Sequence, residues 1–244
     1  LSGNRDPEEL EASDRDTVQD PQKRSPRDFA LWKKDTEHLM QWHSPFGWGF
    51  PGWHIECSVM GQTYLGDSFD LHTGGEDLIF PHHECEIAQS EALTEEPLAN
   101  YWAHTRFLQV EGEKMSKSKG NFFTVRDLIL PEAEGGRGID PLAVRYELIS
   151  GHYRKQLNFT FDQLEGSAKA VRRYREADEK VAQAIDADRP GEDQIGDRLE
   201  TIYAETLKAM ADDLNTPQAL ARAYEGTKEI LGPDSLSAAS ARSA

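Results

Sequence analysis

Residues 69–93, FDLHTGGEDLIFPHHECEIAQSEAL, decide the fold class of this chain. The alternating start Phe69–Leu71 and the glycine pair Gly74–Gly75 are typical of a strand that ends in a turn. Pro81 stands where proline is favoured, at the first position of a helix that we expect to fill the rest of the stretch. A second strand is expected over Thr105–Val110, so strand, helix and strand follow one another and predict a parallel α/β layer.

The segments on either side of this layer have other patterns. Phe29–Trp53 is dense in glycine, proline and aromatic residues, which predicts a rigid loop, and a helix is expected over His54–Leu65. From about Asp140 apolar residues recur at helical spacing. Three amphipathic helices are expected, at roughly 162–187, 192–213 and 216–231.

Polar segments enclose both parts. Residues 1–28 contain Asp, Glu, Arg, Ser and Pro without a hydrophobic period, which is typical of a connector. The sequence therefore predicts four parts: a connector at 1–28, an α/β part at 29–150, helices at 151–232 and a loose Ser- and Ala-rich tail at 233–244. The first residue is leucine, and both ends indicate a piece of a longer chain.

The chain is acidic: its 244 residues include 44 Asp and Glu against 27 Lys and Arg, and its net charge is −17. Either an ordinary solvated surface or the high-salt adaptation of a halophile explains this charge. No run approaches 18 apolar residues, which excludes a membrane-spanning helix. Two cysteines cannot form a disulfide framework, and they favour a reducing, cytoplasmic location.

Three side chains are candidate metal ligands: Cys57, His82 and Glu86. His82 and Glu86 are four residues apart and share one face of the expected helix. Thiolate, imidazole and carboxylate all suit zinc. The ordinary alternative is a buried core cysteine beside a chance His–Glu pair. His83 and Cys85 are expected to point elsewhere on the helix and are left out of the site.

A lysine-rich string follows the second expected strand. Residues 114–121, KMSKSKGN, place three ammonium groups within six positions. Such close cations repel one another unless an anion lies between them, and serine and glycine permit a loop that closes over a polyphosphate. The ordinary alternative is a solvated charged loop.

The lysine string resembles the signature loop of class I aminoacyl-tRNA synthetases. Four further segments resemble cysteinyl-tRNA synthetases, in the order of that family over about 28–231: Asp28–Lys33, Gly52–Ser58, Phe80–Ser90 and Gly151–Phe159. The resemblance implies the second half of a Rossmann-like nucleotide-binding domain followed by an all-α helical bundle. It also implies a monomeric ligase that activates cysteine with ATP to cysteinyl adenylate and transfers it to tRNA(Cys).

The resemblance assigns a role to each candidate residue. Zinc, which selects the cysteine thiolate over the serine hydroxyl, would be held by Cys57, His82 and Glu86. Contacts to the substrate cysteine would come from Trp53, His72 and Asp77. The nucleotide would be approached by Gly74 and Gly75 and contacted by Lys117. Catalysis at the ATP phosphates, with Mg²⁺ as the expected counter-ion, would use Lys114 and Lys117.

Two parts of the family pattern are missing from the sequence: the His-Ile-Gly-His signature and a fourth zinc ligand, a cysteine. The chain alone is therefore expected to be inactive. Two alternative functions stay open. One is the related ligase that joins cysteine to a glucosaminyl-inositol in mycothiol synthesis, and the other is a non-catalytic fragment that binds zinc or tRNA.

Overall fold

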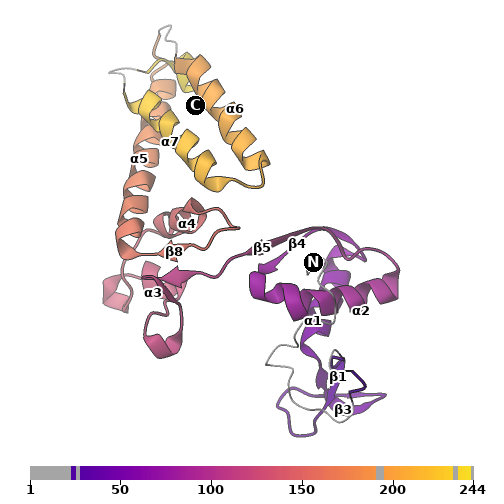
Figure 1. Cartoon of the computed structure of the whole chain (residues 1–244). Helices are drawn as coiled ribbons and strands as arrows, with labels where there is room; N and C mark the ends of the chain where they lie inside the picture. The colour runs from indigo at the N-terminus through magenta and orange to yellow at the C-terminus, as the bar shows by residue number, and fades with distance from the viewer. Residues whose placement is uncertain (1–22, 26–27, 191–194, 233–235, 243–244) are drawn as a thin grey trace. The chain divides into compact units, whose positions relative to one another are not determined.

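The computed structural model describes residues 23–25, 28–190, 195–232 and 236–242, and the chain forms two compact units, 1–105 and 106–244. Most of the predicted connector at 1–28 lies outside the described residues. Along the sequence, the boundary between the units falls inside the segment expected to be the strand Thr105–Val110. There one strand, β5, which Figure 1 labels, ends at Thr105. The next strand, β6, starts only at Gln109.

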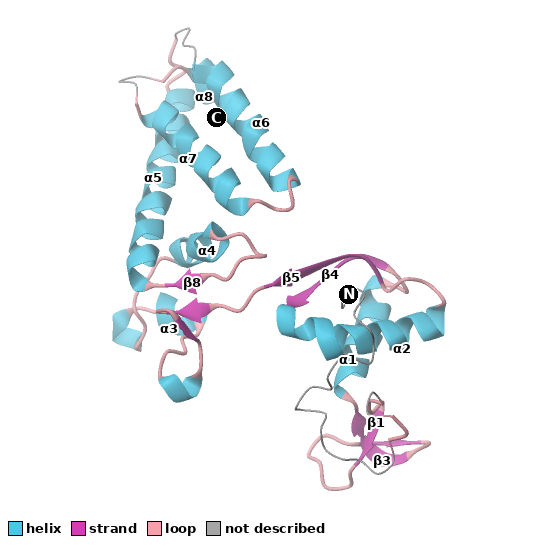
Figure 2. Ribbon diagram, in the orientation of Figure 1, coloured by secondary structure: helices cyan, strands magenta, loops and turns pink. Residues whose placement is uncertain are grey.

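The first unit is built on two parallel strands, β4 (Phe69–Gly75) and β5 (Ala99–Thr105), and two helices that contact each other, α1 (Trp53–Leu65) and α2 (Glu84–Thr94) (Figure 2). Helix α1 agrees with the predicted helix to within one residue. The expected turn at Gly74–Gly75 is wrong, because both glycines belong to β4 and pair with residues of β5.

Helix α2 begins later than Pro81 predicts. The extended backbone of Phe80 interrupts the helical conformation, with φ −136° and ψ 134°. A 3₁₀ turn at Glu76–Leu78 and a π-type turn at Ile79–His83 precede α2, which starts only at Glu84. The candidate ligand His82 therefore belongs to this irregular turn and Glu86 to the helix.

A small antiparallel sheet occupies the segment in which the sequence predicts a rigid loop. Its strand order is β1-β3-β2, with the bounds β1 (Trp32–Lys34), β2 (Trp42–Ser44) and β3 (Gly47–Pro51). Gly49 in the central strand permits the close approach of β1, because a Cβ there would lie 2.1 Å from the carbonyl oxygen of Lys33. The glycines that predict a loop thus serve strand packing instead.

The second unit begins with another three-stranded sheet, of order β7-β6-β8. Its strands and short helices are β6 (Gln109–Val110), β7 (Glu113–Lys114), α3 (Val125–Ile129), α4 (Pro141–Ser150) and β8 (Asn158–Phe159). Strand β6 pairs parallel with β8 and antiparallel with β7. An apolar cluster joins these elements to the next helix through Val110, Leu128, Ala143, Val144, Phe159 and Leu164.

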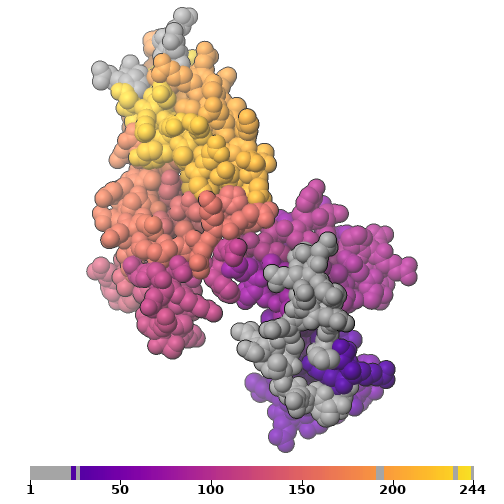
Figure 3. Space-filling view, viewed as in Figure 1, coloured from indigo at the N-terminus to yellow at the C-terminus, as the bar shows by residue number. Residues whose placement is uncertain are grey.

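Three longer helices follow, close to their predicted ranges: α5 (Phe161–Asp186), α6 (Ile195–Ala211) and α7 (Thr216–Leu231). The side chains of Thr160 and Asn215 cap α5 and α7 by accepting hydrogen bonds from backbone N–H groups. Helices α6 and α7 contact each other, and Figure 3 shows them in orange and yellow.

The described part of the predicted tail is packed rather than loose. It contains the short helix α8 (Ala238–Ala241), and Leu236 is fully buried. Leu236 joins an apolar cluster with residues of α5, α6 and α7, because leucine gains more from burial than the Ser- and Ala-rich composition suggests. Among the described residues, no helix has the length and apolar character that a membrane span requires.

Candidate functional site

Five of the eight histidines in the chain gather in the first unit, around the turn that precedes α2. They are His54, His72, His82, His83 and His104. Adjacent rings have centroids 4.6–5.6 Å apart. These imidazoles come from α1, β4, the π-type turn and β5, so all the main elements of this unit converge on one cluster.

The carboxylate of Glu86 lies in the middle of this cluster and is 1% exposed. His72 Nε2 donates a hydrogen bond to Glu86 Oε2 at 2.6 Å. The other oxygen, Oε1, is 2.6 Å from His82 Nε2, but the orientation of the two groups does not make a hydrogen bond, and Oε1 has no donor among the described residues. Burial would raise the pKa of Glu86, but the His72 bond and the nearby His82 outweigh it, and the pKa is lowered.

Cys57 completes a trio with His82 and Glu86. One ligand atom from each residue lies within 4.8 Å of the other two. Burial and the adjacent Glu86 carboxylate raise the pKa of the Cys57 thiol to about 11. A bound cation would reverse this effect, since it stabilises the thiolate.

His82 is oriented as a metal ligand would be. Its Nε2 faces Glu86, while its Nδ1 is 2.8 Å from Nδ1 of His54 and shares a hydrogen bond with it. A hydrogen bond on the second ring nitrogen fixes the tautomer and the ring orientation of a ligating histidine. The donor set and the donor-free carboxylate oxygen therefore fit a soft divalent metal.

A second trio consists of His72, His83 and Glu86, whose ligand atoms also lie within 4.8 Å of one another. The sequence predicts that His83 points away from the site, on the assumption of α-helical spacing. His83 instead precedes α2 in the turn Ile79–His83, which is not α-helical, and its ring faces the cluster. Burial lowers the pKa of His83 to about 4. Cys85 is buried and belongs to neither trio.

The remaining predicted residues of the first unit lie close to this cluster or beside β4. The ring of Trp53, the first residue of α1, is 4.5 Å from that of His82. Gly74 makes room for His83, because a Cβ there would lie 2.6 Å from its Cε1 atom. Asp77 is exposed in the 3₁₀ turn, and its Oδ1 lies 2.5 Å from the point that a Cβ on Gly75 would occupy.

The lysine loop belongs to the second unit. Lys114 Nζ lies 5.1 Å from the ring centroid of Phe107, and Lys117 Nζ lies 5.5 Å from that of Phe122. Neither ammonium group has a carboxylate partner in the described part of the chain. Lys119 differs, because its Nζ is 3.0 Å from Oε2 of Glu113.

A side-chain amide fixes the shape of this loop. Asn121 Oδ1 accepts a hydrogen bond from Ser116 N at 2.8 Å, and its Nδ2 donates to Lys114 O at 3.3 Å. Gly120 has φ 69°, a conformation that glycine adopts without strain. The loop thus presents two unpaired cations, as the phosphate-loop hypothesis requires.

Sequence reasoning did not identify His54, His104 or Trp102 as members of the cluster. Trp102 stacks on His72 with ring centroids 4.5 Å apart, and His104 Nε2 is 2.8 Å from His83 Nδ1. The density of histidine between residues 54 and 104 is the signal that could have identified them. Their convergence depends on the parallel pairing of β4 with β5, which spacing alone does not reveal.

Comparisons with known proteins give a consistent result. The sequence pattern of the tRNA synthetases class I (C) catalytic domain matches residues 2–170. A cysteine–tRNA ligase of Salinibacter ruber is 62% identical over 253 residues, which cover 100% of this chain and 49% of the relative. Cysteine–tRNA ligases of Koribacter versatilis and Caldicellulosiruptor saccharolyticus are 48% and 45% identical, over 87% and 85% of this chain and 42% and 44% of theirs.

The chain therefore spans about half the length of the curated relatives that it matches. The family pattern nevertheless covers well over half of the chain itself. The chain belongs to the class I tRNA synthetases, within the family defined by the class I (C) catalytic domain.

Proposed function

We propose that this chain supplies the metal-binding half of a cysteine–tRNA ligase, which activates cysteine with ATP and transfers it to tRNA(Cys). The observation that carries the proposal is 62% identity to a cysteine–tRNA ligase across the whole chain. The relatives do not favour the glucosaminyl-inositol ligase. The two cysteines form no disulfide, which agrees with action in the reducing cytoplasm. We also propose that the protein is a monomer.

The metal site of the proposed enzyme consists of Cys57, His82 and Glu86, and the proposed ion is zinc. Three features support this choice: the mixed thiol, imidazole and carboxylate set, the donor-free Glu86 Oε1, and the His54 bond that orients His82. When bound, zinc would hold the substrate thiolate and disfavour serine, because it prefers soft sulfur to a neutral hydroxyl.

The other candidate residues bind and orient the substrates. Trp53 contacts the His82 ring and would close one side of the cysteine pocket. His72 holds Glu86 and would face the substrate, and Asp77 is the proposed partner of its ammonium group. We assign the approach to the nucleotide to the backbone of Gly74 and Gly75, where His83 and Asp77 take up the space that side chains would need.

The lysine loop is the proposed phosphate clamp. Lys114 and Lys117 have no carboxylate partner among the described residues, so their charges are available to ATP, with Mg²⁺ as its counter-ion. Cations held at the phosphates stabilise the charge that develops in the transition state.

The proposed architecture is the second half of a Rossmann-like domain at 29–150, followed by a tRNA-contacting helical bundle at 151–232. The parallel pair β4–β5 and the helices α1 and α2 support the first assignment. The packing of α7 against both α5 and α6 supports the second. We assign residues 1–28 to a connective insertion and 233–244 to a terminal segment.

The test is a chimaera in which this chain replaces the matching half of the Salinibacter ruber relative. Lys117→Ala in the chimaera should slow adenylate formation by about 10²–10³-fold, the effect of losing one transition-state donor. Cysteine-dependent ATP–pyrophosphate exchange measures this rate. Lys119→Ala is the matched control, since that ammonium is already paired with Glu113. No exchange by the unmutated chimaera, in a protein that is folded, would refute the proposed activity.

The net charge of −17 supports a further proposal, that the protein is adapted to high salt. Screening by salt shortens the range of repulsion among the acidic groups. The unfolding midpoint in denaturant should therefore rise as sodium chloride is increased from about 0.1 M to about 1 M, where the Debye length falls to about 3 Å. A midpoint that is flat or falls over this range would exclude the halophilic adaptation.

A further inference from the structure

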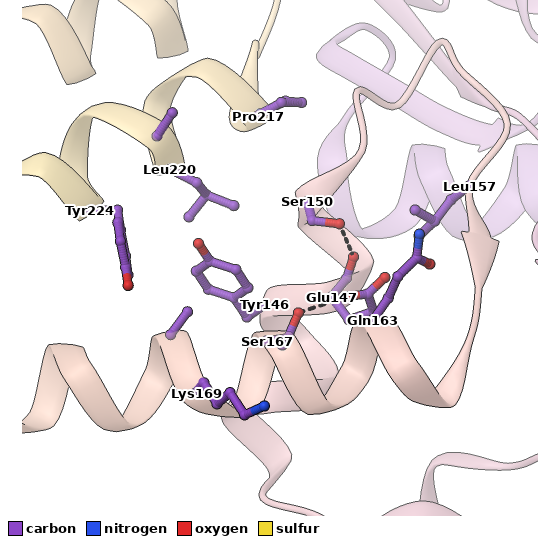
Figure 4. A pocket seen from close by; sticks show the side chains of 13 residues that line it. Tyr146, Glu147, Ser150, Leu157, Gln163, Ser167, Lys169, Pro217, Leu220 and Tyr224 are labelled. Carbon is purple, nitrogen blue, oxygen red and sulfur yellow. Dashed lines mark hydrogen bonds between the residues drawn. The ribbon is translucent and has the colours of Figure 1, made fainter.

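A cavity of about 530 Å³ opens in the second unit between α4, α5 and the first turns of α7 (Figure 4). Leu157, Pro217 and Leu220 supply apolar walls, and the ring of Tyr146 lies in the middle of the view. Gly166 leaves one side open, because a Cβ there would meet no atom within 4 Å. The volume is in the range that holds small organic ligands.

A buried carboxylate forms the floor of this cavity. Glu147 is 3% exposed and accepts a hydrogen bond from Ser167 Oγ at 2.6 Å. In the part of the chain that the structure describes, no lysine, arginine or histidine forms an ion pair with it. A buried charge without a counter-charge costs several kcal/mol, so a cation that reached Glu147 would be strongly favoured.

Two cationic side chains of α5, Lys169 and Arg173, contact groups other than Glu147. Lys169, which lines the cavity, pairs through Nζ with Glu165 Oε1 at 3.2 Å on the outer surface of the helix. Arg173 donates from Nε to Thr227 Oγ1 at 2.9 Å. Neither side chain forms an ion pair with Glu147, so the carboxylate at the floor of the cavity is open to a cation from outside the chain.

We propose that this cavity binds a small organic cation, a primary ammonium group carried on a short apolar or aromatic body. The ammonium group would pair with Glu147, while the face of the Tyr146 ring adds a cation–π attraction. The body of the ligand would fill the space beside Leu157 and Leu220. This site is independent of the proposed ligase reaction, because it uses none of the residues assigned to cysteine, ATP or metal.

The probe that tests the proposal is 2-phenylethylamine, and 2-phenylethanol is its neutral counterpart. Ligand-observed NMR titrations of the 244-residue chain measure the binding of each compound. The titrations use about 0.3 M salt, which limits non-specific attraction to the acidic surface. We expect the amine to bind at least about tenfold more tightly than the alcohol, the ratio expected from one charge-assisted hydrogen bond.

Two variants should abolish this preference by different routes. Glu147→Gln keeps an acceptor for Ser167 but removes the charge, and it should weaken amine binding about tenfold or more. Gly166→Leu places a side chain in the open space of the cavity and should block the amine and the alcohol alike. Leucine also favours a helix more than glycine does, so this variant should fold even if Glu147→Gln does not.

Glu165→Gln is the matched control, since it removes the same charge from the outer surface of α5. It should leave amine binding within about twofold of the parent, as expected for a screened surface charge. Equal loss in Glu165→Gln and Glu147→Gln would show general attraction to an acidic protein and would overturn the proposal. Undiminished binding by a folded Gly166→Leu variant would also overturn it, as would equal affinity for the alcohol and the amine.

Discussion

The two units of this chain bury different kinds of side chain. Both apolar clusters of the described residues belong to the second unit, around Phe159 and around Leu236. The fully or almost fully buried side chains of the first unit are instead mainly polar, among them His82, His83 and Glu86. One unit is therefore stabilised by the removal of apolar surface from water, and the other encloses a cluster of titratable groups.

The apolar interior of the second unit bears on stability, and the polar interior of the first unit bears on chemistry. Apolar burial contributes roughly 25 cal/mol per Å², and it is the usual content of a protein interior. A buried carboxylate or thiolate costs free energy unless a hydrogen bond, a counter-charge or a metal compensates it. The polar interior of the first unit is thus the more informative one, because a ligand is the simplest reason to retain it.

The largest expected effect tests the apolar interior of the second unit. Phe159 is 4% exposed, and Phe159→Ala should lower the free energy of unfolding by about 3–5 kcal/mol, the sum of lost transfer energy and a residual cavity. Urea denaturation, with hydrogen exchange of α5 as a local probe, measures the loss. Phe46→Ala, at a side chain 67% exposed, is the control and should cost much less. Equal losses in both variants would contradict the placement of Phe159 in the apolar interior of the second unit.

A smaller effect tests the polar interior of the first unit. Zinc at about one hundred times its dissociation constant should stabilise the folded state by about 2.7 kcal/mol, by mass action. Cys57→Ala should abolish this gain and lower the bound zinc measured by elemental analysis.

Cys85→Ala is the control for the metal, because Cys85 is buried but belongs to neither trio of ligands. We expect it to retain zinc even if it is less stable than the parent. Equal zinc in the parent and in Cys57→Ala would remove Cys57 from the site, and the second trio, His72, His83 and Glu86, would then become the better assignment.

The same contrast explains which features the sequence could predict. The ranges of α5, α6 and α7 follow from local periodicity, so these helices agree closely with expectation. The residues that cap α5 and α7, Thr160 and Asn215, are seen only in the structure. The trio Cys57, His82 and Glu86 could be predicted from the sequence, because its residue types suit a metal and because His82 and Glu86 are only four residues apart. The partners of this trio were not accessible from the sequence, because the pairing of the distant strands β4 and β5 is what places Trp102 against His72 and His104 against His83.

The irregular segments account for most of the remaining differences. Glycine and proline predict a loop over residues 29–53, but Gly49 is there to let β1 approach β3. Pro81 predicts a helix start, but the extended Phe80 inserts a π-type turn that also carries His83 into the cluster. In both segments the tertiary contacts decide the local conformation, which residue propensities cannot anticipate.

The smallest expected effect concerns a cluster on the surface of the second unit. Asp213 accepts hydrogen bonds from Tyr153 Oη at 2.6 Å and from Arg154 Nη2 at 3.1 Å, and its backbone has φ 53°. The hydrogen bonds from Arg154 and Tyr153 lower the pKa of Asp213 from an ordinary 3.8 to about 2. The carboxylate is thus stabilised in its charged form by the loop at 152–154.

Because the folded pKa is the lower one, this contribution to stability is present above about pH 4 and is lost as the pH falls through about 2. Asp213→Asn should therefore be less stable than the parent near neutral pH, and the difference should narrow between pH 4 and pH 2. Urea midpoints across this range measure it, and Asp212→Asn, a neighbouring carboxylate, should differ less from the parent at neutral pH. A difference for Asp213→Asn that stays constant with pH would mean that the charge of this carboxylate does not hold the 152–154 loop to the α6–α7 turn.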